Sequence, residues 1–463
     1  MSETAAPYDL VILGDVVLSD RVVAGGYIAV RGESIAAIGE GVPPPALRVA
    51  DHRGKLLMPG LVDGHMHTSS ATGWPGIEGA TMSAAAGGVT TVCDMPYDVP
   101  DPVTTAAIFA GKVAAVHRLA HVDMALYATI KKSGGADDIA ALAEAGASAF
   151  KVSTYEYDAH RFPRIDHPTM LGAFAEIAKT GLMVGVHNED QELVVKLTEA
   201  AKAAGNTSPI WHCKTRPPIT ETMADLEIFE MALETGAHVH IAHSSLARGF
   251  DLAKLYRAQG ARTSGEACIQ YLCMTEEDII RLQGFGKCTP PFRTAEEVER
   301  MWGAMRDGTV AYVSTDHAPW PKARKEYTGD IFAVGAGLTG LQSFAPLMYT
   351  LLMERGMAPC VMAKACSEDP ARFHGLDPKK GGIRLGADAD VCVLETGDFI
   401  FDERIIQDRE DARWSPYHGR AMKARVAATY LRGAEIWDGT EVKARPGTGR
   451  FVPRQHRRSA LDA

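Results

Sequence analysis

Six residues of types that bind or bridge metal ions are spread along the middle of this 463-residue sequence. Four are histidines, one is an aspartate and one is a lysine. Imidazole nitrogens and carboxylate oxygens are ligands preferred by Zn²⁺ and similar borderline ions. Each residue stands at or near the end of a short apolar run, and together they are His65, His67, Lys151, His187, His243 and Asp316.

Lys151 is the member of this set that a metal site does not obviously accept. A protonated amine beside two divalent ions would be repelled, while burial and nearby positive charge favour the neutral amine. A neutral amine can add carbon dioxide and become a carbamate, an anion whose two oxygens can bridge two ions. The residue type allows this chemistry, but spacing alone does not reveal it.

The apolar runs before these residues are predicted to be β-strands, and amphipathic stretches such as residues 102–119 and 168–180 are predicted to be helices between them. Eight strands with intervening helices over about 300 residues match a (β/α)₈ TIM barrel, in which the carboxyl ends of all strands meet at one mouth. The predicted strands cover residues 61–65, 90–94, 122–130, 149–153, 182–187, 238–244, 261–267 and 310–316.

The alternative is a doubly wound open sheet. That fold normally carries a glycine-rich phosphate-binding turn after its first strand, and none follows residues 61–65. The barrel is therefore the preferred prediction, because it brings residues about 250 positions apart in sequence to one site.

Other histidines show what a structural role would look like. His238 and His240 have the opposite strand parity to His243, so they are predicted to face the other side of their strand. His317 is one position out of phase with Asp316. A single histidine at a strand end is weak evidence, and the prediction depends on several ligand types coinciding at carboxyl ends.

Both ends of the chain differ from this alternating middle. Residues 8–58 carry short β-type runs separated by turn residues, typical of a small antiparallel sheet, and residues 387–439 repeat the pattern. We predict one small β-sandwich domain built from both termini. The predicted boundaries are residues 1–58 for its N-terminal part, 59–379 for the barrel, and 380–463 for its C-terminal part and tail.

Composition narrows the class of protein. The 48 Lys and Arg residues against 58 Asp and Glu give a formal charge of −10, and the short basic run Arg454, Arg457 and Arg458 is interpreted as a solvated tail. Eight scattered cysteines without a CxxC pair indicate reduced thiols. The sequence has neither a signal-peptide pattern at its start nor an apolar run long enough to span a membrane. We predict a cytoplasmic protein without a nucleic-acid or membrane partner.

Several longer motifs resemble those of the cyclic amidohydrolases, a group of the amidohydrolase superfamily that includes hydantoinases, dihydropyrimidinases, allantoinases and dihydroorotases. The resemblance covers nearly the whole chain. It rests on MPGLVDGHMHTSS (58–70), GGVTTVCDMP (87–96), AFKVSTYEY (149–157), VGVHNED (184–190), HVHIAHSS (238–245), KCTPPFR (287–293), STDHAP (314–319), GLTGLQSFAPL (337–347) and the segment 369–395.

The resemblance implies a site with two divalent ions, for which Zn²⁺ is preferred and Mn²⁺ or Co²⁺ are alternatives. One ion would take His65, His67 and Asp316, the other His187 and His243, and a carbamate on Lys151 would bridge both. A hydroxide shared by the ions would attack the ring carbonyl. Asp316 would act as the general base and then return the proton to the departing ring nitrogen.

Within the group, dihydroorotases carry Arg and Asn at two positions that serve the substrate carboxylate, and here these are Ser69 and Tyr97. The hydantoinase tyrosine that supports the oxyanion lies five residues after the bridging lysine. In this sequence tyrosines stand at +4 and +6, so either could take that role or simply pack in a loop. The predicted substrate contacts are Tyr155, with Tyr157 as its alternative, and Thr289, Ala336 and Gly337.

The resulting prediction is an enzyme that hydrolyses a ring C–N amide bond in a hydantoin-, dihydropyrimidine- or allantoin-type substrate, assembled as a homo-oligomer (tetramer or dimer). Hydantoinase-like stretches (207–218, 270–272, 446–451) and allantoinase-like stretches (161–170, 287–293) both occur. Two alternatives remain. One is a dihydroorotase-like enzyme. The other is a non-catalytic dihydropyrimidinase-related protein, a class that has lost metal ligands.

Overall fold

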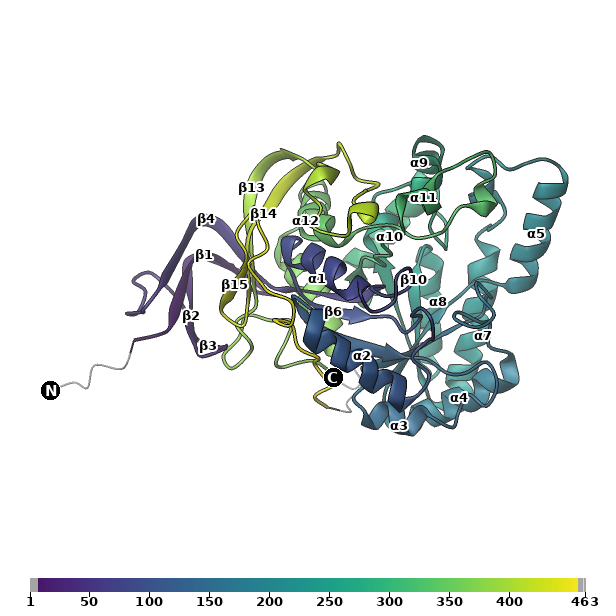
Figure 1. Cartoon of the computed structure of the whole chain (residues 1–463), viewed down its shortest axis with the longest axis horizontal. Coiled ribbons are helices and arrows are strands. Elements are labelled where there is room, and N and C mark those ends of the chain that lie inside the picture. Colours follow the sequence, from purple (N-terminus) through teal and green to yellow (C-terminus); the bar gives the residue numbers. More distant parts are fainter. Residues whose placement is uncertain (1–6, 457–460, 462–463) are drawn as a thin grey trace.

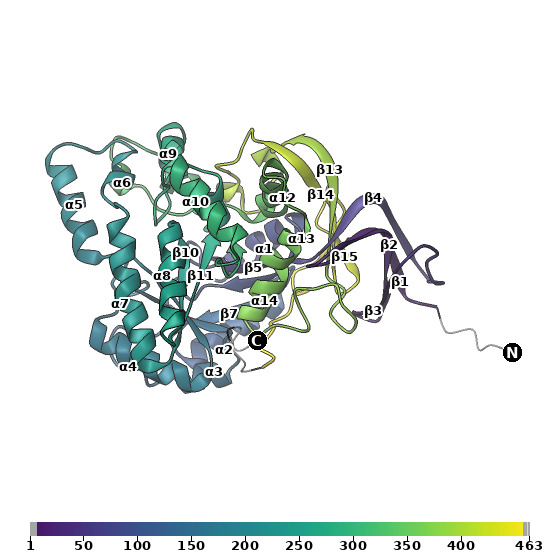
Figure 2. The ribbon, with the colours of Figure 1, turned by 180° about the vertical axis from the view of Figure 1, so that it is seen from behind.

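The computed structural model describes residues 7–456 and 461, and two separate sheets organise it (Figure 1). An eight-stranded sheet with helices around it forms one part, and a seven-stranded sheet built from both ends of the chain forms the other (Figure 2). The predicted fold class, a barrel with a β-domain from both termini, is confirmed. Arg457 and Arg458 of the predicted basic tail lie outside the described residues.

The eight-stranded sheet is parallel and closes on itself. Consecutive strands pair in sequence order, and its ends meet because Met66 and His317 form a parallel bridge. The backbone NH of Asp316 also donates to the carbonyl of His65 at 2.9 Å. The strands are β5 (Leu61–Met66), β6 (Val89–Asp94), β7 (Asp123–Ala128), β8 (Ala149–Ser153), β9 (Met183–His187), β10 (His238–Ser244), β11 (Arg262–Cys268) and β12 (Val313–Ser314).

All eight predicted strands are present, and the last is much shorter than expected. Residues 310–316 were predicted to be extended, but β12 contains only two residues. Asp316 adopts a positive φ of 48°, which a strand cannot accommodate, so the extended backbone does not continue through it. The strand is therefore replaced by a bend that places Asp316 at the barrel closure.

Helices follow most of the barrel strands. The helix predicted over residues 102–119 starts later, at Ala106, because the Thr105 side chain caps it by accepting from the backbone NH of Ile108. The helices are α1 (Gly76–Ala86), α2 (Ala106–Leu119), α3 (Ile139–Glu144), α4 (His167–Thr180), α5 (Gln191–Ala203), α6 (Trp211–Lys214), α7 (Ile219–Thr235), α8 (Ala247–Ala258), α9 (Glu276–Leu282), α10 (Ala295–Arg306), α11 (Lys322–Lys325), α12 (Phe344–Glu354), α13 (Cys360–Ala363) and α14 (Asp369–Phe373).

The second sheet joins the two ends of the chain in the order β15-β14-β13-β4-β1-β2-β3. It is mixed rather than antiparallel as predicted, because β1 pairs with β4 in parallel. The direct join between the two chain ends is the antiparallel pair β4–β13. Its strands are β1 (Leu10–Val17), β2 (Val22–Arg31), β3 (Ser34–Glu40), β4 (Val49–Pro59), β13 (Val391–Ile400), β14 (Ala421–Leu431) and β15 (Ala434–Trp437). The exact domain limits at 58/59 and 379/380 remain predictions.

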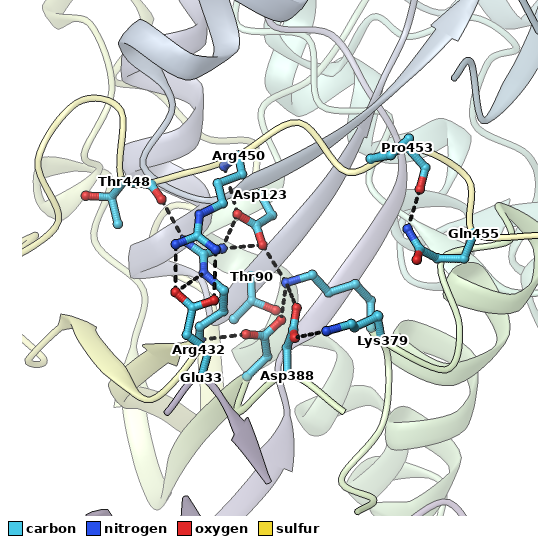
Figure 3. Close-up of polar contacts among 12 residues, drawn as sticks. Glu33, Thr90, Asp123, Lys379, Asp388, Arg432, Thr448, Arg450, Pro453 and Gln455 are labelled. Atoms are coloured by element: carbon cyan, nitrogen blue, oxygen red, sulfur yellow. Dashed lines mark hydrogen bonds and ion pairs between the residues drawn. The ribbon is translucent and has the colours of Figure 1, made fainter. Parts of the chain in front are cut away.

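A buried charge cluster connects the barrel to this sheet (Figure 3). Asp123, at the start of β7, accepts hydrogen bonds from Lys380, Arg432 and the backbone NH of Arg450. Lys380 also contacts Asp388 and Asp390, at 2.9 Å each. We call Asp123, Lys380, Asp388, Asp390 and Arg432 the junction cluster.

The interior of the barrel contradicts one prediction. His238 and His240 were expected to face away from the side that His243 faces, but both bond the Ser264 hydroxyl, and His240 stacks on Tyr312. The register shift between Ile241 and Ser244 and a positive φ of 42° at His243 break the alternation, so all three rings reach the interior. Side chains from strands β5 to β9 meet in this interior with Tyr312, among them Val62, Cys93, Tyr127, Ala149 and Met183.

Two further observations concern the described part of the chain. All eight cysteines are free. None of the helices between residues 7 and 456 is both long and apolar enough to cross a membrane.

Candidate metal centre at the barrel mouth

The six predicted metal-site residues all lie at the carboxyl-terminal side of the barrel strands. His65 is the second-last residue of β5, and His67 follows that strand directly. Lys151 is in β8, His187 ends β9, and His243 is near the end of β10. Asp316 follows β12. All are buried except His67, which is half-buried and faces the cleft.

One half of the set forms a compact three-residue group. The Oδ1 atom of Asp316 lies 3.4 Å from Nε2 of His65 and 3.3 Å from Nε2 of His67. A ligand atom from each of the three lies within 4.8 Å of the others, a spacing that one metal ion can span. These three residues are the ones that the sequence analysis expects to hold the first ion.

The other half lies directly beside it. Nδ1 of His187 and Nε2 of His243 are 2.9 Å apart, and the ring centroids of His65 and His243 are 5.2 Å apart. The stem of Lys151 passes Gly185 of the neighbouring strand β9. The structure therefore brings all six predicted residues into one region.

Three buried nitrogens of this region lack a hydrogen-bond partner among the described residues: Nζ of Lys151, Nε2 of His65 and Nδ1 of His243. Buried polar atoms are normally paired, so each orphan calls for an explanation. Metal ions and a carbamate would supply what these donor sets lack. The residues present therefore fit the expected group.

Electrostatics at the mouth favour neutral nitrogens. Burial lowers the pKa of Lys151 to about 8, although the Glu266 and Asp316 carboxylates oppose the shift. Burial and then the charge of Lys151 hold the pKa values of His65 and His243 well below the ordinary range. Neutral imidazoles present lone pairs to a metal, and a neutral amine can form a carbamate.

Asp316 stays ionised in this setting. Burial acts to raise the pKa of its carboxyl, but His65 and His67 outweigh burial and hold it below its ordinary value. The side chain is 11% exposed, toward the cleft. It can therefore bind a cation and also reach a substrate proton. Its positive φ, like that of His243, is a strained conformation of the kind found at functional sites.

Two carboxylates that sequence reasoning did not single out orient the imidazoles. Glu266 in β11 bonds Nδ1 of His65 and accepts from the backbone NH of His243 at 3.1 Å. Glu189 lies 3.0 Å from Nε2 of His187 and pairs with Arg216 at 3.1 Å. Such partners fix which ring nitrogen faces a metal. In sequence, Glu266 stands two residues from both Ser264 and Cys268, so alternation along β11 puts all three on one side of the strand. This was the available sequence signal for Glu266.

A cleft of about 580 Å³, partly open to solvent, lies over this region. Three of the four predicted substrate contacts line it: Thr289, Ala336 and Gly337. The fourth, Tyr155, is not among the lining residues, and its alternative Tyr157 is. Tyr155 instead packs edge-on against the Tyr157 ring, with 5.0 Å between the ring centroids. The cleft is lined by His67, Ser70, Tyr97, Tyr157, Arg161, Phe162, His187, His243, Thr289, Asp316, Ala318, Trp320, Ala336 and Gly337.

Two buried lysines hold the wall of the cleft that carries Ala336 and Gly337. Lys325 Nζ donates to the carbonyls of Lys287, Gly335 and Gly337 at 2.8–2.9 Å. Lys287 Nζ donates to the carbonyls of Ile331 and Val334. These bonds fix the backbone of this wall from behind.

The chain matches the family model described as "Amidohydrolase family" over residues 56–434. It is a member of the amidohydrolase family. Two similar relatives are allantoinases: that of Rubrobacter xylanophilus is 34% identical over 96% of this chain and 97% of its own length, and that of Solibacter usitatus is 34% identical over 95% and 96%.

The solved structures point to the same part of the family. The L-hydantoinase (dihydropyrimidinase) of Arthrobacter aurescens superposes with a TM-score of 0.91 and 29% identity, covering 96% of this chain and 100% of that one. This amidohydrolase therefore belongs to the cyclic amidohydrolase group, as its motifs predicted.

The cleft also contains a group that sequence reasoning did not find. Ser69 and Tyr97 stand where dihydroorotases carry their carboxylate-binding residues, and the sequence offered no replacement. The structure places a guanidinium in the cleft from a third position, Arg161, on the loop after β8. The allantoinase-like stretch 161–170 begins at Arg161, but that resemblance assigns the residue no role, and the loop brings it to the cleft only in the folded chain.

Proposed function

We propose that this amidohydrolase opens the ring of a cyclic ureide, with allantoin as the first substrate to test and 5-substituted hydantoins as the second. As a cyclic amidohydrolase, the chain is a hydrolase of cyclic amides. Its curated relatives over nearly the full length are named allantoinases. The L-hydantoinase fold match supports the second candidate. The observation that carries the proposal is the convergence of six ligand-type residues with three orphaned buried nitrogens.

In this proposal, His65, His67 and Asp316 hold one divalent ion, and His187 and His243 hold the other. Lys151, as a carbamate, would supply further oxygen ligands to these ions. When bound, such ions lower the pKa of water and polarise a carbonyl oxygen. Zn²⁺ is the preferred ion, with Mn²⁺ or Co²⁺ as alternatives.

Asp316 moves the proton. Its low pKa keeps it a carboxylate at neutral pH, so it can accept a proton from the attacking water. The water oxygen bonds to the ring carbonyl carbon, the ring C–N bond breaks, and Asp316 returns the proton to the departing nitrogen. Tyr157 and the backbone at Ala336 and Gly337 face the same cleft and would position the ring.

Purified protein tests the proposal directly. We expect about two divalent ions per chain by elemental analysis and loss of a ring-specific absorbance with allantoin or a hydantoin. His65→Ala and His187→Ala should lower metal content and turnover together. Protein that binds no metal and opens no ring after incubation with Zn²⁺, Mn²⁺ or Co²⁺ and bicarbonate would contradict the proposal and favour a non-catalytic role.

We also propose a cytoplasmic homo-oligomer, a tetramer or a dimer. Light scattering of the metal-loaded protein measures the oligomeric state, and a monomer at micromolar concentration would contradict it.

A further inference from the structure

Arg161 is a half-buried guanidinium that lines the substrate cleft and has no carboxylate within 4 Å among the described residues. The two carboxylates that act on the pKa of its side chain, Asp158 and Asp98, form hydrogen bonds with other groups. Asp158 accepts from the backbone NH groups of His160 and Arg161, and Asp98 is bonded by Lys112 and Trp74. Burial lowers the pKa of Arg161, but a guanidinium stays charged at neutral pH.

The position of Arg161 relative to the metal centre is given by short contacts. Its Nη1 donates to the carbonyl of Tyr97 at 2.9 Å. The Ser70 hydroxyl donates to the same carbonyl at 3.1 Å, and Ser70 Oγ is 3.2 Å from Nδ1 of His67. Only one serine and one carbonyl therefore separate the guanidinium from a predicted metal ligand.

An aromatic wall runs from the metal centre toward this guanidinium. Tyr157 meets His187 edge-on at 5.3 Å between ring centroids, and Phe162 stacks on Tyr157 at 5.3 Å. Tyr97 then stacks on Phe162 at 3.7 Å. A flat ring substituent can lie along this wall and end near Arg161. Trp320 also lines the cleft and carries the Arg324 guanidinium on its face at 4.5 Å.

We propose that Arg161 is a specificity-determining residue that selects cyclic amides whose ring substituent ends in a planar oxygen acceptor. A ureido carbonyl and a carboxylate share this chemistry, and both match the hydrogen-bonding fork of arginine. The inference rests on the proposed ring-opening function and names the substrate class for it. A half-buried cation without a carboxylate partner costs stability, so an acceptor from the substrate supplies the partner that the chain does not.

The test compares three substrates of similar ring: allantoin with a ureido group, 5-(carboxymethyl)hydantoin with a carboxylate, and 5-methylhydantoin with neither. We expect Arg161→Met to lower kcat/KM about 10- to 100-fold for at least one acceptor-bearing substrate, the range for a lost hydrogen bond to a charged group. The loss on 5-methylhydantoin should stay within about 3-fold. The acceptor-bearing substrate that loses more identifies the natural substituent.

Two variants separate recognition from loop support, because Arg161 also ties its loop to Tyr97. Arg161→Lys keeps the charge but not the fork, so it should recover part of the activity on a carboxylate and less on a ureido group. Arg164→Met is the matched control on the same loop, since Arg164 does not line the cleft, and it should leave all three substrates unchanged.

Equal losses on all three substrates in Arg161→Met would overturn the inference and make Arg161 a loop support. A wild-type preference for 5-methylhydantoin would overturn it as well. If the wild type opens none of the rings, the proposed function fails instead. Calorimetric binding of the same compounds to metal-loaded protein then decides the inference: weaker binding of acceptor-bearing compounds to Arg161→Met supports it, and unchanged binding overturns it.

Discussion

Two buried lysines of this protein have opposite electrostatic surroundings. Lys380, in the junction cluster, contacts three carboxylates, and although burial opposes its charge, Asp390, Asp123 and Asp388 raise its pKa above the ordinary lysine value. Lys151, at the barrel mouth, has no hydrogen-bond partner among the described residues, and burial lowers its pKa to about 8. Both residues are buried to the same extent, with about 1–2% of their surface exposed.

The difference separates a buried lysine whose charge stabilises the structure, Lys380, from a buried lysine that is prepared for a ligand, Lys151. The junction cluster is satisfied by protein atoms, so it joins the barrel to the terminal sheet without further partners. The mouth leaves nitrogens unpaired, a cost that a protein tolerates where another group completes the site. Five measurements can sharpen or break this comparison.

The largest expected effect is on activity in Lys151→Ala. Removing the bridge should abolish detectable turnover and reduce bound metal, while the free energy of unfolding of the metal-free protein stays the same or rises. Short carboxylic acids such as acetate should restore part of the activity by supplying the missing oxygens. Lys151→Arg should fail too, because a guanidinium cannot form a carbamate. Full activity in Lys151→Ala would show that Lys151 is not the bridge.

Asp316→Asn tests proton transfer apart from metal binding. The amide keeps one oxygen ligand but cannot accept a proton, so kcat should fall on the order of 10²–10⁴-fold with most metal retained. In the wild type the rate should fall on the acid side as the carboxylate becomes protonated, below the ordinary carboxyl pKa because that pKa is lowered. Near-normal turnover at full metal occupancy would leave Asp316 a ligand only.

Lys380→Met tests the junction cluster. The variant leaves Asp123, Asp388 and Asp390 with one buried cation fewer, and urea unfolding should show a loss of about 3–5 kcal/mol. The control is Lys379→Met, whose exposed side chain lies 3.6 Å from Asp388 and should cost no more than about 1 kcal/mol. Similar losses in both variants would show that burial does not set the value of these ion pairs.

The pH dependence of stability should have opposite signs at the two lysines. In the folded state Lys151 loses its proton near pH 8, while in the unfolded chain it does so near pH 10.4. The unfolded chain therefore binds more protons between these values, and stability rises with pH. For metal-free protein in buffer without carbon dioxide, we expect the gain from pH 7.5 to 9.5 to be about 2 kcal/mol larger in wild type than in Lys151→Met, because Lys287, whose pKa burial lowers to about 7, adds its own rise to both proteins.

Lys380, with its raised pKa, keeps its contribution throughout that window and loses it only at higher pH. An equal gain from pH 7.5 to 9.5 in wild type and Lys151→Met would show that other groups cause the rise.

The smallest effect is expected at the rim of the junction. Arg450 makes a two-bond pair with Glu33 at 2.6 and 2.8 Å, but both side chains are about half exposed (54% and 50%). Solvent screening should limit the cost of Glu33→Gln to under about 1 kcal/mol in urea unfolding. A loss as large as that of Lys380→Met would show that this exposed pair stabilises the protein as much as the buried junction cluster does.

The sequence by itself determined the architecture and identified the candidate metal ligands. Eight apolar runs of strand length predicted the barrel strands, and candidate ligand residues at or near the ends of five of them were placed at one mouth, because parallel barrel strands share the direction of their carboxyl ends. Paired β-type ends predicted the terminal sheet. These signals are local, so they can be recognised in the sequence without knowing which residues are neighbours in space.

Only the tertiary structure decided which side chains complete the site. The bend at Asp316 and the positive φ at His243 broke the strand alternation, which follows from contacts across the barrel rather than from residue order. Glu266, Glu189 and Arg161 reach the mouth from segments whose sequences predict no such role. Lys151 and Lys380 are the same residue type, and only their surroundings in the fold, unpaired in one place and ringed by carboxylates in the other, assign one to chemistry and the other to structure.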